Sequence, residues 1–192
     1  MSTARKYEPH YTVDDMQLWE GDWELWFGTA VSMSPSPFGP HERMITKLIG
    51  QIERSFEEHR CVHCSAYAGL DWIVQQDTVV RPDVMIVCGD QPSRHLERPP
   101  SLTIEVLSPS TAKKDLEAKR DLYESNQIEH YLIINPDDHA VQWFSLGRDG
   151  AFVDTTQQIT SPRRCTARLK SGCDIDLDFE KLFASLDIPP KI

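Results

Sequence analysis

Apolar residues recur at intervals of three and four between about residues 41 and 59, at Ile45, Leu48, Ile49, Ile52 and Phe56. This spacing places them on one face of an α-helix, so it predicts a helix over about 41–59. A similar stripe predicts a second helix over about 112–126. Shorter helices are expected over 13–20, with Thr12 as the N-cap, and over 178–186.

Short runs rich in Val, Ile and aromatic residues predict β-strands between these helices. The runs cover residues 61–67, 69–74, 82–88, 102–107 and 130–135. Two further pairs of runs predict hairpins, 23–28 with 30–33 and 141–146 with 151–156. Three prolines predict a loop over 34–40. This order of elements predicts an α/β (α+β) fold with a central mixed sheet flanked by helices.

The length of 192 residues suits one domain, and we expect it to span 1–192 because no change in composition marks a boundary. Hydrophobic residues make up 40% and charged residues 26%, which are values of ordinary globular proteins. The sequence has no apolar run long enough to cross a bilayer and no signal-peptide pattern at its start. We therefore expect a cytoplasmic protein without membrane association.

The five cysteines are scattered, and Cys61 and Cys64 form a C-x-x-C motif. A zinc site usually needs a second ligand pair at a suitable spacing, and the nearby His59 and His63 do not complete such a pattern. The motif alone is a weak zinc or redox signal. The favoured interpretation is reduced cysteines on or near a strand, in a chain long enough to fold without disulfides.

The net charge of −10 argues against a protein that binds nucleic acid through bulk electrostatics. It does not exclude a nuclease, whose acidic residues can gather around a metal ion. Basic residues also cluster, in one group of Lys113, Lys114, Lys119 and Arg120 and in another of Arg163, Arg164, Arg168 and Lys170. Each group can be a solvated surface or a phosphate contact.

Three charged residues stand at positions where apolar residues are expected. Asp83 opens an apolar strand, Glu105 lies inside the run SLTIEVL, and Lys119 falls on the helical stripe that contains Ala112, Leu116 and Tyr123. Charges in such places are usually paired or coordinate a metal, because burying an isolated charge is costly. Each residue alone also has a structural explanation, such as a turn at Asp83 or a surface ion pair of Lys119 with Asp115.

Taken together, the three residues predict a shared metal site for phosphodiester hydrolysis. If the two strands are neighbours, Asp83 and Glu105 can bind one divalent cation, with the backbone carbonyl of Val106 as a further ligand. Hard oxygen ligands suit Mg²⁺ or Mn²⁺. The metal would act as a Lewis acid and lower the pKa of bound water, while Lys119 would stabilise charge on the phosphate.

These residues resemble the PD-(D/E)XK nuclease superfamily, with Pro82-Asp83 as the PD pair and Glu105-Val106-Leu107 as the second element. Leucine stands where that superfamily usually has lysine, and Lys119 fits branches in which the lysine has moved to the following helix. The sequence is more similar to the Uma-type family of bacterial restriction-endonuclease-like proteins. This likeness spans about residues 11–146, through WELWFGTAVSMSPSP, RPDVMIV, IEVLSPSTAKKDLEAKRDLY and EHYLIINP.

The resemblance implies a restriction-endonuclease-like fold with a nuclease core over about 11–146 and a C-terminal extension over 147–192. It implies catalytic roles for Asp83, Glu105 and Lys119, a role for Glu24 as the family's early acidic residue, and an accessory role for His41. Tyr123 is a further accessory candidate because it shares the helical stripe of Lys119.

The favoured hypothesis is therefore a Mg²⁺- or Mn²⁺-dependent DNA endonuclease, expected to form a homodimer. One alternative is a protein of the same fold that binds nucleic acid or a protein partner without cutting. Another is a structural or partner-binding protein with an interface formed by Trp19, Trp23 and Trp26, although these residues suit a core or hairpin better.

Overall fold

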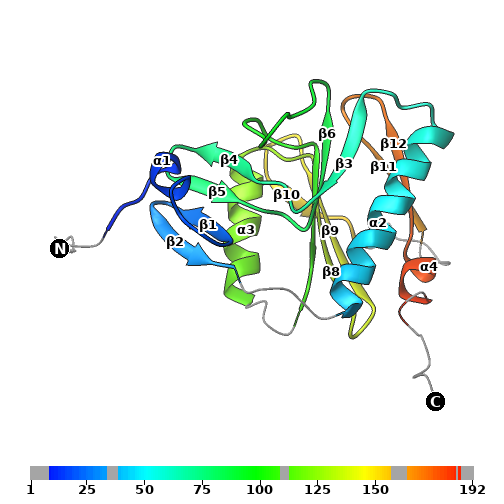
Figure 1. Ribbon diagram of the computed structural model, residues 1–192. Helices are drawn as coiled ribbons and strands as arrows, with labels where there is room; N and C mark the ends of the chain where they lie inside the picture. The colour runs from blue at the N-terminus through cyan, green and yellow to red at the C-terminus, as the bar shows by residue number, and fades with distance from the viewer. Residues whose placement is uncertain (1–8, 34–38, 109–112, 157–163, 185, 187–192) are drawn as a thin grey trace, which may run out of the picture.

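A computed structural model of the protein describes residues 9–33, 39–108, 113–156, 164–184 and 186. Its centre is a six-stranded sheet with helix α2 (Gly39–Glu58) on one side and helix α3 (Lys113–Ser125) on the other (Figure 1). A smaller sheet and a C-terminal hairpin complete the fold. Residues 34–38 of the predicted loop, Ala112 and Arg163 lie outside the described residues. The last two residues of that loop, Gly39 and Pro40, belong to the first turn of α2 instead.

The strand order of the large sheet is β10-β9-β8-β7-β6-β3. Its strands are β3 (Cys64–Ala68), β6 (Val84–Cys88), β7 (Leu102–Val106), β8 (His130–Asn135), β9 (Ala140–Leu146) and β10 (Phe152–Asp154). β7 and β8 pair in parallel, whereas the other neighbours are antiparallel. The sheet is mixed, as the sequence predicted. The pairing of β6 with β7 brings the strands of Asp83 and Glu105 together.

The two faces of the large sheet bury two separate hydrophobic clusters. Helix α2 (Gly39–Glu58) covers one face, and its stripe packs against Ile104 and Val106 of β7. Helix α3 (Lys113–Ser125) covers the other face, where Tyr123 packs against Met85 and Val87. Successive side chains of a central strand therefore pack into opposite clusters, one on each face of the sheet. Glu105 lies on the α3 side, where it contacts Tyr123.

A four-stranded sheet of order β2-β1-β5-β4 lies beside α3 in Figure 1. Its strands are β1 (Trp23–Trp26), β2 (Thr29–Ser32), β4 (Trp72–Gln75) and β5 (Thr78–Val80). The hairpin predicted across Gly28 is present, whereas the short strand β5 was not predicted. Helix α1 (Val13–Met16) is capped by Thr12 as predicted but ends before the expected residue 20. After the helix, the backbone forms turn hydrogen bonds between residues three apart, such as the bond from Leu18 N–H to Asp15 O at 3.0 Å.

The C-terminal part forms a hairpin, β11 (Arg164–Arg168) with β12 (Asp174–Asp178), followed by α4 (Phe179–Ala184). The two strands were not predicted. The hairpin packs on α2, where Gln51 and Ser55 bond to the backbone of β12. Arg164 forms an ion pair across the strands with Asp178 at 3.0 Å, and Arg168 forms one with Asp174 at 3.5 Å. These partners favour a structural role for the two arginines of the second basic group.

The cysteines differ from the expected reduced state. Disulfides join Cys61 to Cys173 and Cys64 to Cys88, whereas Cys165 is free. The first bond joins residues 112 positions apart, which the spacing of the C-x-x-C motif cannot reveal. Among the described residues, no helix has the length and apolar character needed to cross a membrane.

Candidate active site

Asp83 is held at the start of β6 by contacts from two other elements. Its Oδ2 accepts a hydrogen bond from the backbone N–H of Val106 at 2.7 Å and lies 3.3 Å from Nε2 of His41 on α2. The hydrogen bond to Asp83 raises the pKa of His41, although burial of the imidazole opposes the shift. The Asp83 side chain keeps 24% of its exposure, so this carboxylate reaches both the protein interior and solvent.

Glu105 is buried in the middle of the site, with 7% of its side chain exposed. Its Oε1 accepts a hydrogen bond from the Tyr123 hydroxyl at 2.7 Å, and its Oε2 accepts one from Lys119 Nζ at 2.9 Å. Burial raises the pKa of Glu105 to about 7. The Lys119 charge opposes this shift, whereas the negative charge of Asp83 adds to it. The negative charge of Asp83 thus disfavours ionisation of Glu105.

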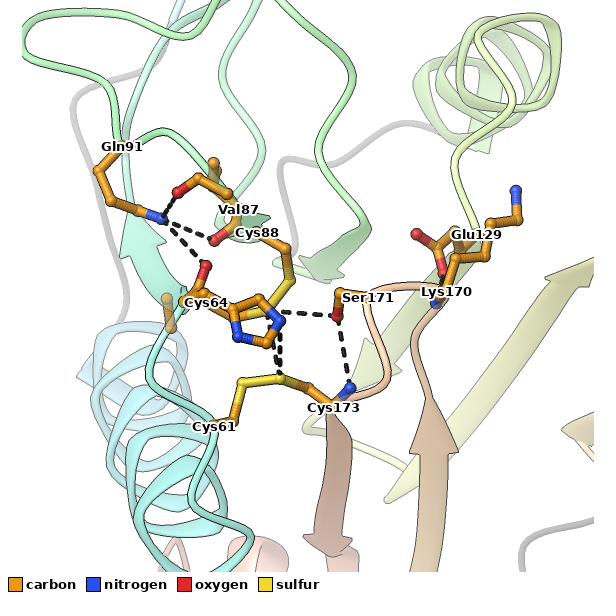
Figure 2. The surroundings of a disulfide bond; sticks show 12 residues. Cys61, Cys64, Val87, Cys88, Gln91, Glu129, Lys170, Ser171 and Cys173 are labelled. Atoms are coloured by element: carbon orange, nitrogen blue, oxygen red, sulfur yellow. Dashed lines mark hydrogen bonds between the residues drawn. A yellow bond between two sulfur atoms is a disulfide. The ribbon is translucent and has the colours of Figure 1, made fainter.

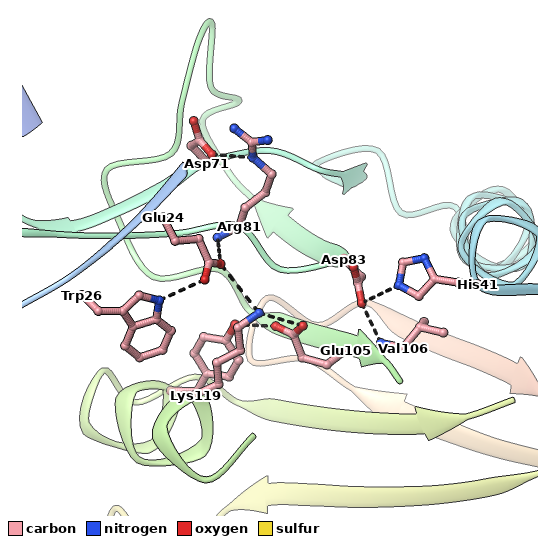
Figure 3. A network of polar contacts seen from close by, with 10 residues as sticks. Glu24, Trp26, His41, Asp71, Arg81, Asp83, Glu105, Val106 and Lys119 are labelled. Atoms are coloured by element: carbon pink, nitrogen blue, oxygen red, sulfur yellow. Dashed lines mark hydrogen bonds and ion pairs between the residues drawn. The ribbon is translucent and has the colours of Figure 1, made fainter. Parts of the chain in front are cut away.

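Lys119 points from α3 between two carboxylates, as Figure 3 shows. Its Nζ lies 2.9 Å from Oε2 of Glu105 and 3.7 Å from Oε1 of Glu24. Burial alone would lower the pKa of Lys119, but the charges of Glu105 and Glu24 outweigh it and raise this pKa. Lys119 is consequently a fixed ammonium ion at neutral pH.

Glu24 is a buried carboxylate of β1 that links the small sheet to the site. Its Oε2 accepts a hydrogen bond from the Trp26 indole at 2.9 Å, and its Oε1 accepts one from the Arg81 backbone N–H at 2.8 Å. The Arg81 side chain is itself fixed by ion pairs with Asp71 and Asp22, both at 2.7 Å. Figure 3 shows this support beside Lys119.

The structure brings all of the candidate residues into one group of contacts, formed by Glu24, His41, Asp83, Glu105, Val106, Lys119 and Tyr123. The alternative partner of Lys119, the side chain of Asp115, lies outside the described part of the chain. The support of Glu24 by Trp26 and Arg81 was not predicted from the sequence. A usable signal for Trp26 was its position two residues after Glu24, which places both on one face of a strand. No comparable signal indicates the backbone N–H of Arg81.

The donor set suits a divalent cation. Asp83 and Glu105 offer hard carboxylate oxygens from neighbouring antiparallel strands. The site also holds the carboxylate of Glu24, and Lys119 is the ammonium that contacts these acids. The site thus holds three carboxylates and only one lysine ammonium. A bound cation would compensate the remaining negative charge.

The architecture matches that of a known nuclease-like structure. The crystal structure titled as a putative nuclease belonging to DUF820 from Anabaena variabilis ATCC 29413 superposes with a TM-score of 0.70. The match covers 92% of this chain and 99% of that chain at 17% sequence identity. The fold is therefore restriction-endonuclease-like, with a mixed sheet between helices.

The sequence itself matches the model of the Uma2 family, described as "Putative restriction endonuclease", over residues 13–170. The chain belongs to this family, as its motifs indicated. No curated protein matches the sequence. Membership of the family supports a nuclease function.

Proposed function

We propose that the protein is a metal-dependent DNA endonuclease that hydrolyses phosphodiester bonds. The observation that carries this proposal is the ammonium of Lys119, largely shielded from solvent and held beside the buried Glu105, with Asp83 at the start of the neighbouring strand. Family membership supports the same class of reaction. A buried charge cluster of this kind is costly to maintain, so a chemical purpose accounts for it better than stability does.

Asp83 and Glu105 would hold Mg²⁺ or Mn²⁺, with the backbone carbonyl of Val106 as a further ligand. When bound, the cation would supply Lewis-acid chemistry that stabilises charge on the phosphate and favours deprotonation of water. The Val106 N–H and His41 hold Asp83 through Oδ2, and Tyr123 holds Glu105 through Oε1. Both carboxylates are thereby kept in place before a cation or substrate arrives.

Lys119 would act as a fixed positive charge. Its raised pKa excludes it as a base at neutral pH, because the amine stays protonated. Its ammonium would stabilise the negative charge that develops on the scissile phosphate. Glu24, supported by Trp26 and Arg81, would orient this ammonium from the side opposite Glu105.

The direct test is cleavage of supercoiled and single-stranded DNA by the purified protein with Mg²⁺ or Mn²⁺. Asp83→Asn and Glu105→Gln should abolish metal-dependent cleavage. Asp90→Asn is a matched control, because Asp90 follows the other end of β6 and is exposed. It should leave cleavage unchanged. Circular dichroism and thermal melting would show that each variant is folded.

Cleavage that persists in both folded site variants would contradict the proposal. Folded protein that cuts none of the substrates but binds DNA, with affinity falling as salt increases, would favour the non-cutting binding role instead. The expected homodimer and the cytoplasmic location stay predictions. Light scattering of the purified protein tests the homodimer.

A further inference from the structure

A second group of chemically reactive side chains lies away from the carboxylates. Cys61, His63 and Cys64 lie close together in the sequence, between the end of α2 and the start of β3. Cys173 directly precedes β12 of the C-terminal hairpin. One ligand atom from each of these residues lies within 4.8 Å of every other. Figure 2 shows the sulfur atoms of Cys61 and Cys64 beside that of Cys173. Cys61, Cys64 and Cys173 are buried, whereas His63 is exposed.

The spacing of these atoms suits a tetrahedral zinc ion. Zinc–sulfur and zinc–nitrogen bond lengths imply edges of about 3.8 Å between two sulfurs and about 3.5 Å between a sulfur and a nitrogen. Cys64 Sγ lies 3.6 Å from Cys173 Sγ, and Cys173 Sγ lies 3.5 Å from His63 Nε2. Neither pair shares a covalent bond, although Cys173 is joined to Cys61 and Cys64 to Cys88 in this structure. The sulfur and nitrogen atoms of the cluster are thus close together even in its disulfide-bonded form.

We infer that the reduced protein binds one Zn²⁺ through Cys61, Cys64, Cys173 and His63. Three thiolates with one imidazole form a donor set that selects zinc over the hard cations of the carboxylate site. The burial of all three sulfur ligands suits a closed structural site. The Ser171 hydroxyl lies 3.5 Å from Cys64 Sγ and can donate a hydrogen bond to that thiolate.

The disulfides of the structure represent the oxidised form of the same cluster. Each disulfide takes two electrons and two protons from a dithiol reductant, which becomes a disulfide in turn. Reduction separates Cys61 from Cys173 and Cys64 from Cys88, so each thiol can take its own position. Zn²⁺ then replaces the protons of three thiols, which pass to the buffer. Cys88 stays a thiol outside the ligand set.

The zinc ion would fasten the C-terminal hairpin to the segment that joins α2 and β3. The ligand Cys64 pairs with Cys88 at the end of β6, whereas Asp83 precedes the start of that strand. The length of β6, about 16 Å, therefore separates the cluster from the carboxylate site. The role is thus structural and separate from cleavage. Cys173 also lies beyond residues 13–170 that the family model matches, so the ligand set includes a residue outside that match.

The test is the zinc content of the full-length protein purified with a reductant, measured by mass spectrometry of the metal. We expect one Zn²⁺ per chain and a lower melting temperature after chelation. Cys173→Ser should lose the metal, whereas Cys88→Ser and Cys165→Ser should keep it. Zinc absent from the reduced wild type, or lost equally in Cys88→Ser, would overturn the proposed ligand set.

A variant that fails to fold would leave Cys173→Ser uninformative, so His63→Ala provides a second measurement. Its exposed side chain can be removed with little effect on packing. Competition with a chromogenic chelator should show zinc affinity at least about 100-fold weaker than in the reduced wild type, since a direct ligand matters more than an outer-shell partner. Co²⁺ titration should give thiolate-to-metal charge-transfer absorption in wild type. Unchanged zinc affinity in His63→Ala, or no such absorption, would contradict the site.

Discussion

Lys119 Nζ on α3 donates a hydrogen bond of 2.9 Å to Oε2 of Glu105 on β7. The contact places a positive charge beside the carboxylate even though Leu107 occupies the usual lysine position of the motif. Leu107 instead packs with the apolar cluster under α3. The helix thus supplies the charge that the strand lacks, and it does so from a different part of the chain.

Replacement of Lys119 by methionine tests this charge directly. Lys119→Met keeps much of the side-chain volume but leaves Glu105 and Glu24 without their ammonium. We expect cleavage to fall at least about 100-fold, as for loss of one charge-stabilising donor. Loss of one partner of a buried pair should also destabilise the fold by about 3 kcal/mol. Cleavage assays and urea denaturation measure the two effects separately.

The position of the lysine is testable in the Lys119→Met background. Leu107→Lys would place an amine on the strand face of Glu105, two residues further along the chain. We expect about ten-fold recovery of cleavage, or about 1.4 kcal/mol of the lost stabilisation. Leu107→Met in the same background is the control and should recover none. Equal activity of the two double variants would show that charge at the strand position cannot replace Lys119.

Tyr123 and Tyr131 provide a matched pair for the hydrogen bond to Glu105. Tyr123 donates to Glu105 Oε1 at 2.7 Å, whereas the buried Tyr131 hydroxyl has no hydrogen-bond partner among the described residues. Tyr123→Phe should cost about 1–3 kcal/mol of unfolding free energy, since it leaves a buried acceptor without its donor. Tyr131→Phe should cost little or nothing. Denaturation curves of both variants, at one pH, give the comparison, and equal losses would contradict it.

Elements with a regular pattern of apolar residues over a short stretch of sequence were predictable. The stripe from Ile45 to Phe56 identified α2, because one face of that helix is buried along its length. Asp83, Glu105 and Lys119 could be selected because each interrupts an apolar pattern, and a buried charge needs a partner. The pairing of β6 with β7 then explains why the first two meet.

Features that depend on distant contacts could not be read in the same way. β5 contains only Thr78–Val80 and gains its stability from neighbours on both sides. The strands of the C-terminal hairpin were obscured by basic residues that pair across it, such as Arg164 with Asp178. Cys61 and Cys173 are 112 residues apart, and only the docking of the hairpin on α2 brings them together.

Replacement of His41 tests whether this residue only supports Asp83 or contacts the substrate itself. His41 contacts Asp83 Oδ2, the same oxygen that already accepts the Val106 N–H. Because the hydrogen bond from the Val106 N–H to Asp83 remains, we expect His41→Gln to reduce cleavage only about ten-fold. This change corresponds to about 1.4 kcal/mol of activation free energy. Asp83→Asn should abolish cleavage. A complete loss in folded His41→Gln would instead indicate that the imidazole contacts the substrate or the reacting atoms.

A last prediction concerns the pH dependence of stability where the C-terminal hairpin meets α2. His59 Nε2 lies 2.7 Å from Oδ2 of Asp176 on β12. The hydrogen bond to Asp176 raises the pKa of His59 above its ordinary value of 6.5, although desolvation opposes the shift. A raised pKa means that the folded protein holds this proton more tightly than the unfolded chain does. The contribution of His59 is therefore complete below pH 6.5 and is lost as pH rises through the raised value.

Asp176 limits the same contact at acid pH. Its hydrogen bond from Thr166 lowers its pKa below 3.8, and His59 adds to this effect. Its contribution is present above pH 3.8 and is lost as pH falls through the lowered value. His59→Gln should therefore destabilise the protein more at about pH 5.5 than at about pH 9, as measured by urea denaturation. A loss of equal size at both pH values would show that the contact acts as a neutral hydrogen bond, because an ion pair requires the protonated imidazole.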